Sequence, residues 1–183
     1  MQAPTHVLAG VLIEKVYSRI NHKWLRFVLI AITALFLHSI MDRIALLTYH
    51  PPEPHFRSIF WLSYHILVVI GFILSLYYFW KAYWIGIFFS ILPDFDWVII
   101  HGKEIFGIQG GFYSQPWMHK SIHFFVDRIP PFSLLQHLPD LREMPTAALT
   151  EIFIACILLY IIFNAPFLWS EENVEEMDME EAD

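Results

Sequence analysis

Residues 59–80 read IFWLSYHILVVIGFILSLYYFW, and this run decides the class of fold. A helix needs about 20 apolar residues to cross a hydrocarbon core of roughly 30 Å. The run meets that length and contains His65 but no aspartate, glutamate, lysine or arginine. The sequence therefore predicts a membrane-spanning helix over Ile59–Trp80.

Three other segments are long enough to extend this prediction to a bundle of helices. Trp24–Leu47 and Thr146–Trp169 are apolar over most of their length. Ala82–Ile100 is also long enough but contains Pro93 in its second half. Proline removes a backbone donor and clashes with the preceding turn, so we expect this helix to kink or end there.

Shorter segments complete the prediction. Thr5–Ile20 indicates a short amphipathic helix, tilted or half inserted, with Thr5 as its N-cap. Gly102–Trp117 is rich in glycine and loop-like, and Met118–Asp127 resumes a helical pattern. We therefore expect an all-α fold: a polytopic membrane helix bundle with one broken helix and a helical re-entrant or surface loop segment.

The composition indicates that much of the protein surface is exposed to lipid. Of the 183 residues, 57% are hydrophobic and only 16% are charged, whereas a soluble domain carries about 25% charged residues. The mean hydropathy is +0.50. Tryptophans cluster at the ends of the apolar runs, where such rings settle at the level of the lipid headgroups.

The net charge of −7 comes from the end of the sequence. Residues 170–183 contain eight carboxylates and no base, and without these eight the 18 acidic residues become ten, against 11 basic ones. We expect one membrane-embedded domain over residues 1–169, followed by a solvated and disordered acidic tail. The tail offers a possible docking segment for a protein partner, and no nucleic-acid partner is expected.

Histidines and aspartates recur at spacings suited to metal binding. His38 and Asp42 are four residues apart and share one helix face, as do His119 and His123, with Asp127 one turn further. A carboxylate inside a membrane helix is expensive, so we expect Asp42 to be paired or functional. If successive segments alternate sides, every candidate ligand falls near one membrane face. The candidate metal ligands are His6, His38, Asp42, Asp94, Asp96, His119 and His123.

Imidazole and carboxylate ligands suit zinc best, with manganese or iron as alternatives. The single cysteine excludes a thiolate cluster within the chain. Seven candidate ligands exceed the three or four that one catalytic zinc uses, so one or two ions are expected. Paired metals are typical of phosphoester hydrolysis. Asp96 or Asp127 is the expected catalytic residue, acting as a base or holding a histidine tautomer. Alternatively, Asp94 and Asp96 merely end a helix at the interface.

Four short motifs together resemble one family, the bacterial and archaeal inner-membrane proteins described as membrane-bound metal-dependent hydrolases, the YdjM-like group. The motifs are a histidine before small residues, a Pro-Asp-x-Asp break, a double-histidine element, and a His-x-x-x-Asp helix followed by prolines. They lie here at residues 5–10, 92–96, 119–123 and 37–52. Lys120 and Ser121 stand where the family has Arg and Gly, and the His-x-x-x-Asp helix precedes the double-histidine element instead of following it. The resemblance implies a metal-dependent hydrolase.

The leading functional hypothesis is a hydrolase that cleaves a phosphoester or other ester of a lipid-like, amphipathic substrate at the membrane interface. The alternatives are a non-enzymatic membrane subunit with a structural metal or proton-handling cluster, and a di-iron oxygenase, which needs more histidine-rich motifs. Basic residues in the short connectors favour a cell-membrane protein with its metal site toward the outer face and its tail in the cytoplasm.

Overall fold

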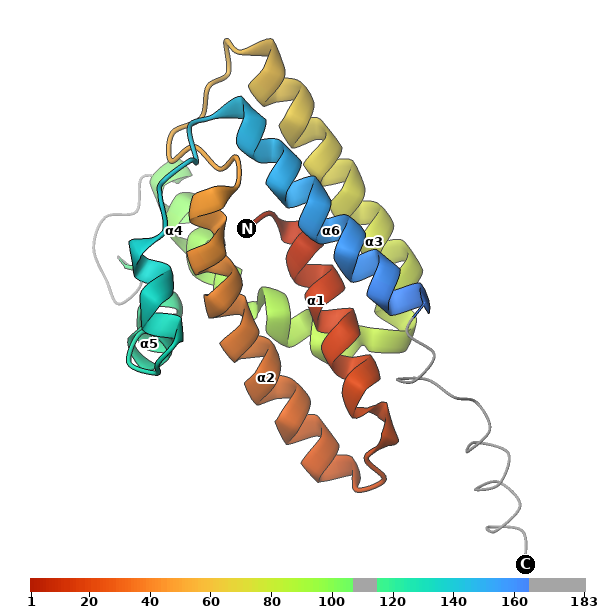
Figure 1. Cartoon of the computed structure of the whole chain (residues 1–183). Helices are drawn as coiled ribbons and strands as arrows, with labels where there is room; N and C mark the ends of the chain where they lie inside the picture. Colours follow the sequence, from red (N-terminus) through yellow and green to blue (C-terminus); the bar gives the residue numbers. More distant parts are fainter. Residues whose placement is uncertain (107–114, 165–183) are drawn as a thin grey trace, which may run out of the picture.

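The computed structural model describes residues 1–106 and 115–164, and within them the chain is helical without strands (Figure 1). Three stretches are long and apolar enough to cross a membrane: Lys23–Leu47, Ile59–Lys103 and Pro145–Asn164. The predicted all-α membrane bundle is confirmed. The acidic tail lies outside the described residues. The α-helices are α1 (Ala3–Val16), α2 (Lys23–Ile44), α3 (Ile59–Ile91), α4 (Phe95–Ile105), α5 (Trp117–Val126) and α6 (Ala148–Asn164).

Short 3-10 helices extend or join these elements. They cover Tyr17–Arg19, Ala45–Leu47, Leu92–Asp94, Phe132–His137 and Pro145–Ala147. Side chains cap two of the helices: the Ser58 side chain accepts from the Trp61 amide at the start of α3, and His22 does the same for Leu25 at the start of α2.

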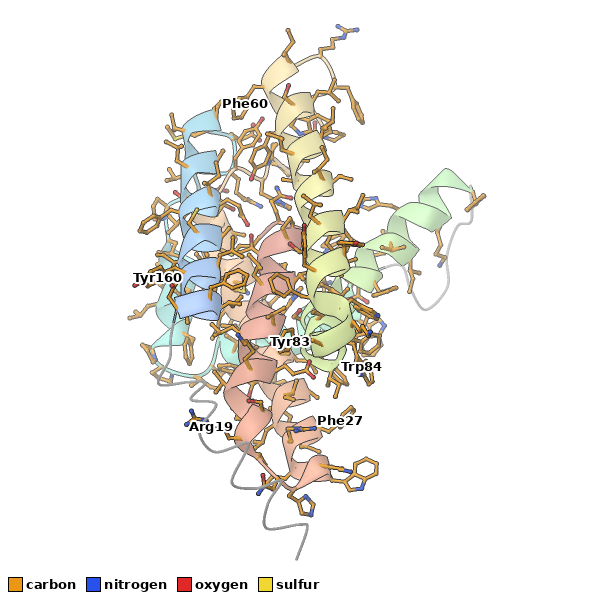
Figure 2. The ribbon with its side chains drawn as sticks, turned by 90° about the vertical axis from the view of Figure 1, so that its right-hand side faces the viewer. Arg19, Phe27, Phe60, Tyr83, Trp84 and Tyr160 are labelled. Atoms are coloured by element: carbon orange, nitrogen blue, oxygen red, sulfur yellow. The ribbon has the colours of Figure 1, made fainter. Side chains whose placement is uncertain are left out.

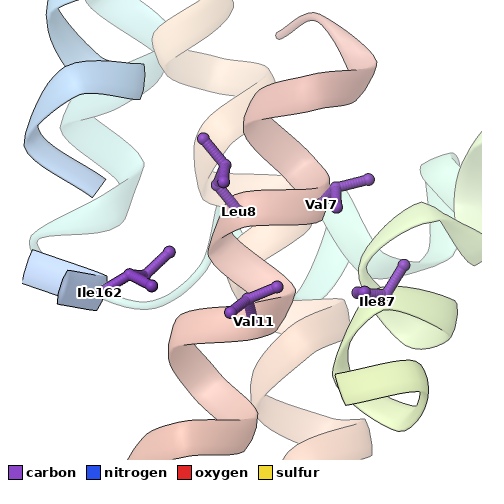
Figure 3. Close-up of a cluster of buried hydrophobic side chains, with 5 residues drawn as sticks. All are labelled: Val7, Leu8, Val11, Ile87 and Ile162. Atoms are coloured by element: carbon purple, nitrogen blue, oxygen red, sulfur yellow. The ribbon is translucent and has the colours of Figure 1, made fainter. Parts of the chain in front are cut away.

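The first helix, α1, is enclosed by α2, α3 and α6 (Figure 1). Thr5 to Val11 are all buried, so the expected amphipathic pattern is wrong for the first turns of α1. Figure 3 shows how this helix packs: Val7, Leu8 and Val11 meet Ile87 of α3 and Ile162 of α6. Because lipid tails are as apolar as these side chains, close packing holds the helices together more than burial from water does.

Two glycines let α1 and α3 approach each other. A Cβ added to Gly10 would lie 2.5 Å from the Gly86 carbonyl oxygen, a separation that real Cβ atoms do not show. Small residues at such crossings are typical of membrane helix pairs. This contact fixes the position of α1 against the second half of α3.

Helix α3 differs from the prediction of two separate segments joined at Lys81. It continues to Ile91 but breaks at Tyr83, where φ is −132° and ψ is 35°. Beyond this break the chain runs across the bundle in Figure 1, and Figure 2 labels Tyr83 and Trp84 at the lower end of the long straight part of α3. A single lysine does not end a helix, since its amine reaches the membrane surface on a long apolar stem. The Gly86 amide beyond the break donates to Glu14 Oε2 at 2.7 Å, which supplies the acceptor that the break removes.

The second break occurs where Pro93 predicted it. Helix α3 ends at Ile91, a 3-10 turn spans Leu92–Asp94, and α4 begins at Phe95. The predicted N-cap role of Thr5 is wrong: Gln2 caps α1 without a side-chain bond, and the Thr5 hydroxyl instead donates to Glu151 of α6. This bond satisfies two buried polar groups at once.

Candidate metal centre

Helices α1 and α2 supply three side chains that converge on one point. His38 and Asp42 lie one turn apart on α2, with His38 Nε2 3.1 Å from Asp42 Oδ2. His6 reaches the other oxygen from α1, and its Nε2 lies 3.3 Å from Asp42 Oδ1. The His6 and His38 rings stack at a centroid distance of 4.2 Å. All three residues belong to a group whose ligand atoms lie within 4.8 Å of one another.

Helix α5 and the break after α3 complete the cluster. His119 Nε2 lies 3.3 Å from His38 Nε2 and 3.4 Å from Asp42 Oδ2. Asp94 stands in the 3-10 turn made by Pro93, and its Oδ1 lies 3.6 Å from His119 Nε2 and 3.8 Å from His38 Nε2. The break at Pro93 therefore brings the Asp94 carboxylate to the cluster. An unbroken helix would have continued past the cluster instead.

These separations match those between ligands around one ion. Two ligands bound to zinc at about 2.0–2.1 Å and a tetrahedral angle lie roughly 3.3–3.4 Å apart. The three distances among His38 Nε2, His119 Nε2 and Asp42 Oδ2 run from 3.1 to 3.4 Å. Asp94 Oδ1 lies slightly further out, as a fourth ligand that would move inward by a few tenths of an ångström.

Hydrogen bonds on the far side of two rings set their tautomers. His38 Nδ1 lies 2.7 Å from the Ser90 carbonyl oxygen. A carbonyl only accepts, so Nδ1 carries the proton and the Nε2 lone pair of a neutral ring faces the cluster. Asp96 Oδ2 accepts from the His119 amide at 3.0 Å and lies 3.4 Å from His119 Nδ1. A metal-binding histidine usually has such a partner behind it.

His6 is the buried group that most lacks a partner. It is 1% exposed, and neither ring nitrogen makes a hydrogen bond of normal geometry within the described residues. An unsatisfied buried polar group costs about 1–3 kcal/mol, and a metal ion held with Asp42 Oδ1 would remove that cost. Asp42 thus presents Oδ2 to the His38–His119 pair and Oδ1 to His6, the arrangement of a carboxylate that bridges two positions. The Met1 amine also lies 3.2 Å from Oδ1.

His123 lies at the edge of this cluster, whereas Asp127 and Asp96 lie around it. His123 Nε2 is 3.8 Å from Asp42 Oδ2, and its Nδ1 is 2.5 Å from the Ser39 hydroxyl. Asp127 forms a two-point pair with Arg43, at 3.0 Å to Nε and 2.5 Å to Nη2. Asp96 stands behind His119, in the position expected of a residue that holds a histidine tautomer.

The two histidines of α5 differ in their proton affinity. Burial lowers the pKa of His119, but its hydrogen bonds to Asp42 and Asp94 outweigh burial and raise the pKa to about 10. Burial, together with the nearby Arg43 guanidinium, lowers the pKa of His123 to about 4. Near neutral pH His119 is therefore protonated in the metal-free protein, whereas His123 is neutral.

Ser39, Ser90 and Arg43 belong to the site but were missed by the sequence analysis. Ser39 follows His38, and no spacing rule links it to His123. Ser90 contributes a backbone carbonyl, which any residue could supply. Of the three, Arg43 could best have been predicted from the sequence. Adjacent residues on a helix do not face each other, so Arg43 cannot pair with Asp42 and needs another carboxylate.

Comparison with known proteins gives no relative from which a role could be carried over. No protein-family model, no curated protein and no solved structure matches this chain. The centre is therefore interpreted from its own geometry.

Proposed function

We propose that the protein is a membrane-bound metal-dependent hydrolase that cleaves a phosphoester or another ester of a lipid-like substrate at the membrane interface. One observation carries this proposal. Two Nε2 atoms and two carboxylates, brought together from α2, α5 and the turn before α4, are spaced as ligands of one ion. Two of the three stretches long enough to cross a membrane carry His38, Asp42 and Asp94.

The ligand set favours zinc, with manganese or iron as alternatives. His38, His119, Asp42 and Asp94 would hold the first ion. His6 and Asp42 Oδ1 would hold a second one more weakly, since they offer fewer ligands. When bound, such an ion acidifies a coordinated water and polarises the ester oxygen.

The protein's own residues would orient the site and leave one side open to substrate. Ser90 and Asp96 fix the two principal rings, while Asp94 is 38% exposed against 1% for the His38 side chain. The open side of the centre therefore lies beside Asp94. Because the sequence motifs also resemble those of metal-dependent hydrolases, hydrolysis is the first reaction to test.

A second candidate function is a structural metal or proton-handling cluster in a non-enzymatic membrane subunit. Its support is the depth of burial: His6, His38 and Asp96 are at most 2% exposed. A closed structural site needs no substrate access, whereas catalytic zinc keeps an open position.

The experiment combines elemental analysis with turnover of a panel of lipid phosphoesters by detergent-purified protein. The hydrolase proposal expects about one equivalent or more of metal, loss of phosphate release in Asp94→Asn, and loss of both metal and turnover in His119→Ala. His137→Ala, at an exposed histidine outside the cluster, is the control. Bound metal with no turnover of any ester would favour a structural metal. Metal below about half an equivalent would exclude the hydrolase and the structural metal and leave the proton-handling cluster.

We further propose that the metal site faces the outer side of a cell membrane, with the acidic tail inside. The support is the set of bases around the short connector between α1 and α2, which are Lys15, Arg19, Lys23 and Arg26. Labelling of a cysteine introduced at exposed Ser18 with a membrane-impermeant maleimide on intact cells tests this orientation, which predicts no labelling until the membrane is opened.

A further inference from the structure

Helix α5 is attached to the bundle by one of its faces. This helix and the residue after it meet α2 through three pairs of side chains: His119 with Asp42, His123 with Ser39, and Asp127 with Arg43. The helix has ten residues and is about 15 Å long at 1.5 Å per residue, which is too short to cross a bilayer. Figure 1 shows it at the edge of the molecule, beside α2. The face of α5 opposite these pairs therefore points away from α2.

The contacts with α2 also set the level of α5 in the membrane. The candidate span that contains α2 ends at Leu47, and its contacts with α5 are made by Ser39 and Arg43. At 1.5 Å per residue these two positions lie roughly 12 Å and 6 Å before the end of the span. A helix packed at this level lies near the boundary between the hydrocarbon core and the lipid headgroups, and not in bulk water.

The outward face of α5 is aromatic. Phe124 and Phe125 are 53% and 66% exposed, and Trp117 is also exposed, whereas His119 and Val126 on the inner face are buried. Contiguous exposed apolar side chains of this size mark a surface that contacts a partner or a membrane. Because α2 beside it is a candidate membrane span, the apolar surface of α5 is continuous with the surface that faces lipid.

Two bases stand among these rings. Lys120 and Arg128 are both exposed, and the Arg128 guanidinium lies 3.3 Å from the centroid of the Phe124 ring and donates to the Phe124 carbonyl at 2.7 Å. Helix α5 itself contains no carboxylate, and Asp127 beyond its end is paired with Arg43. The outward face is therefore positively charged. Aromatic rings together with lysine and arginine are typical of helices that lie in the plane of the membrane interface.

We propose that the outward face of α5 lies in one lipid leaflet, with Phe124 and Phe125 among the upper acyl chains and Lys120 and Arg128 bound to the phosphate groups of phospholipids. The long apolar stems of lysine and arginine let their charges reach the phosphates while the rings stay below them. This lipid-binding surface goes beyond the proposed hydrolase. It does not depend on that function, because it requires neither bound metal nor turnover.

The test measures the depth of α5 by electron paramagnetic resonance of the purified full chain in phosphatidylcholine nanodiscs. A nitroxide is attached to Phe125→Cys in a Cys156→Ser background, and its collision rates with oxygen and with a water-soluble nickel chelate give its depth. Ile70→Cys, exposed in the middle of the apolar run of α3, is the reference for the bilayer centre. Glu53→Cys, exposed in the connector before α3, is the reference for water. We expect the Phe125 label about 5–10 Å below the phosphates.

Charge reversal tests the role of the two bases. In phosphatidylcholine, Lys120→Glu combined with Arg128→Glu should move the Phe125 label toward water, because carboxylates are repelled by the phosphates. Lys81→Glu, at an exposed base on α3, is the control and should leave the depth unchanged. In nanodiscs of digalactosyldiacylglycerol, which has no phosphate, the double variant should lie as deep as its parent. Thermal unfolding of each variant checks the fold.

Three results would overturn the proposal. Collision rates at Phe125 equal to those at Glu53 would place α5 in water, and a depth equal to that of Ile70 would place it in the centre of the bilayer. Low collision rates with both reagents would show that protein covers this face. A shift in the double variant of the same size with and without phosphate would show that the bases do not recognise phosphate. None of these measurements uses a substrate, so they can fail while the hydrolase proposal stands, and the reverse.

Discussion

At the scale of single residues, Asp96 illustrates how a carboxylate can support a candidate metal ligand from behind without being a ligand itself. Its Oδ2 holds the amide and Nδ1 of His119, and its Oδ1 is buried without a partner among the described residues. We expect Asp96→Asn to lower metal affinity by roughly 10–100-fold, the usual effect of losing such a partner. Titration against a fluorescent zinc chelator measures this.

Asp127→Asn is the matched control, because Asp127 pairs with Arg43 and not with a candidate ligand. This variant should keep its zinc affinity. A loss in Asp127→Asn as large as that in Asp96→Asn would contradict the division of roles between the two residues that the sequence analysis left as equal candidates.

The raised pKa of His119, about 10, predicts that metal uptake releases a proton. A protonated imidazole cannot bind metal, so the proton competes below this pKa and apparent zinc affinity should rise about tenfold per pH unit between pH 6.5 and 8.5. His123, with its pKa near 4, is already neutral over this range and adds no slope. Chelator competition at several pH values measures the dependence, and His123→Ala should retain it. A flat profile would show that His119 is neutral before metal binds.

Much of the site was predictable at this scale, because helical spacing alone placed His38 with Asp42 and His119 with His123. The sequence could not rank Asp94 above Asp96 as a ligand. That choice depends on the 3-10 turn at Leu92–Asp94, which directs one carboxylate to the imidazole Nε2 atoms and the other behind His119.

At the scale of secondary-structure elements, the crossing of α1 and α3 depends on Gly10. We expect Gly10→Ala to destabilise the fold by about 1–3 kcal/mol, the usual cost of overpacking, since the new methyl would meet the Gly86 backbone. Gly71→Ala is the control: its Cβ would lie 3.5 Å from Pro4 Cγ, an ordinary contact, and alanine favours the helix by up to about 1 kcal/mol. Thermal unfolding in detergent compares the two, and equal melting temperatures would show that α1 can move away.

The elements themselves were predictable where a backbone rule applied. Pro93 ended α3 as expected, because proline acts on the local chain. The break at Tyr83 carried no such signal: it depends on Glu14 of α1, which accepts from Gly86 across the bundle. The charge of Lys81 separates two apolar segments in the sequence, but the helix continues through it, since a lysine side chain can reach the membrane surface from within a helix.

At the scale of the whole molecule, the candidate metal centre joins parts that are distant in the sequence. Helix α5 contacts the bundle mainly through α2, by way of His119, His123 and the Arg43–Asp127 pair. Removing metal should therefore loosen α5 first. We expect a chelator to speed amide hydrogen exchange in Trp117–Val126 more than in Ala3–Val16, which is packed on several sides.

In the His119→Ala variant, the amide hydrogens of α5 should exchange rapidly with or without chelator, because this variant already lacks the imidazole that links α5 to α2. If chelation sped exchange equally in α1 and α5, the centre would support the whole bundle and not one attached helix. Which remote segments meet could not be read from the sequence, since it depends on how the helices cross.

The enclosed position of α1 has a consequence for biosynthesis. This helix leaves the ribosome before every helix that surrounds it, so its packing is complete only after α6 has been inserted. His6 is synthesised early, yet it can meet the imidazoles of α5 only after most of the chain has been made, so a metal ion held between α1 and α5 would enter late in maturation.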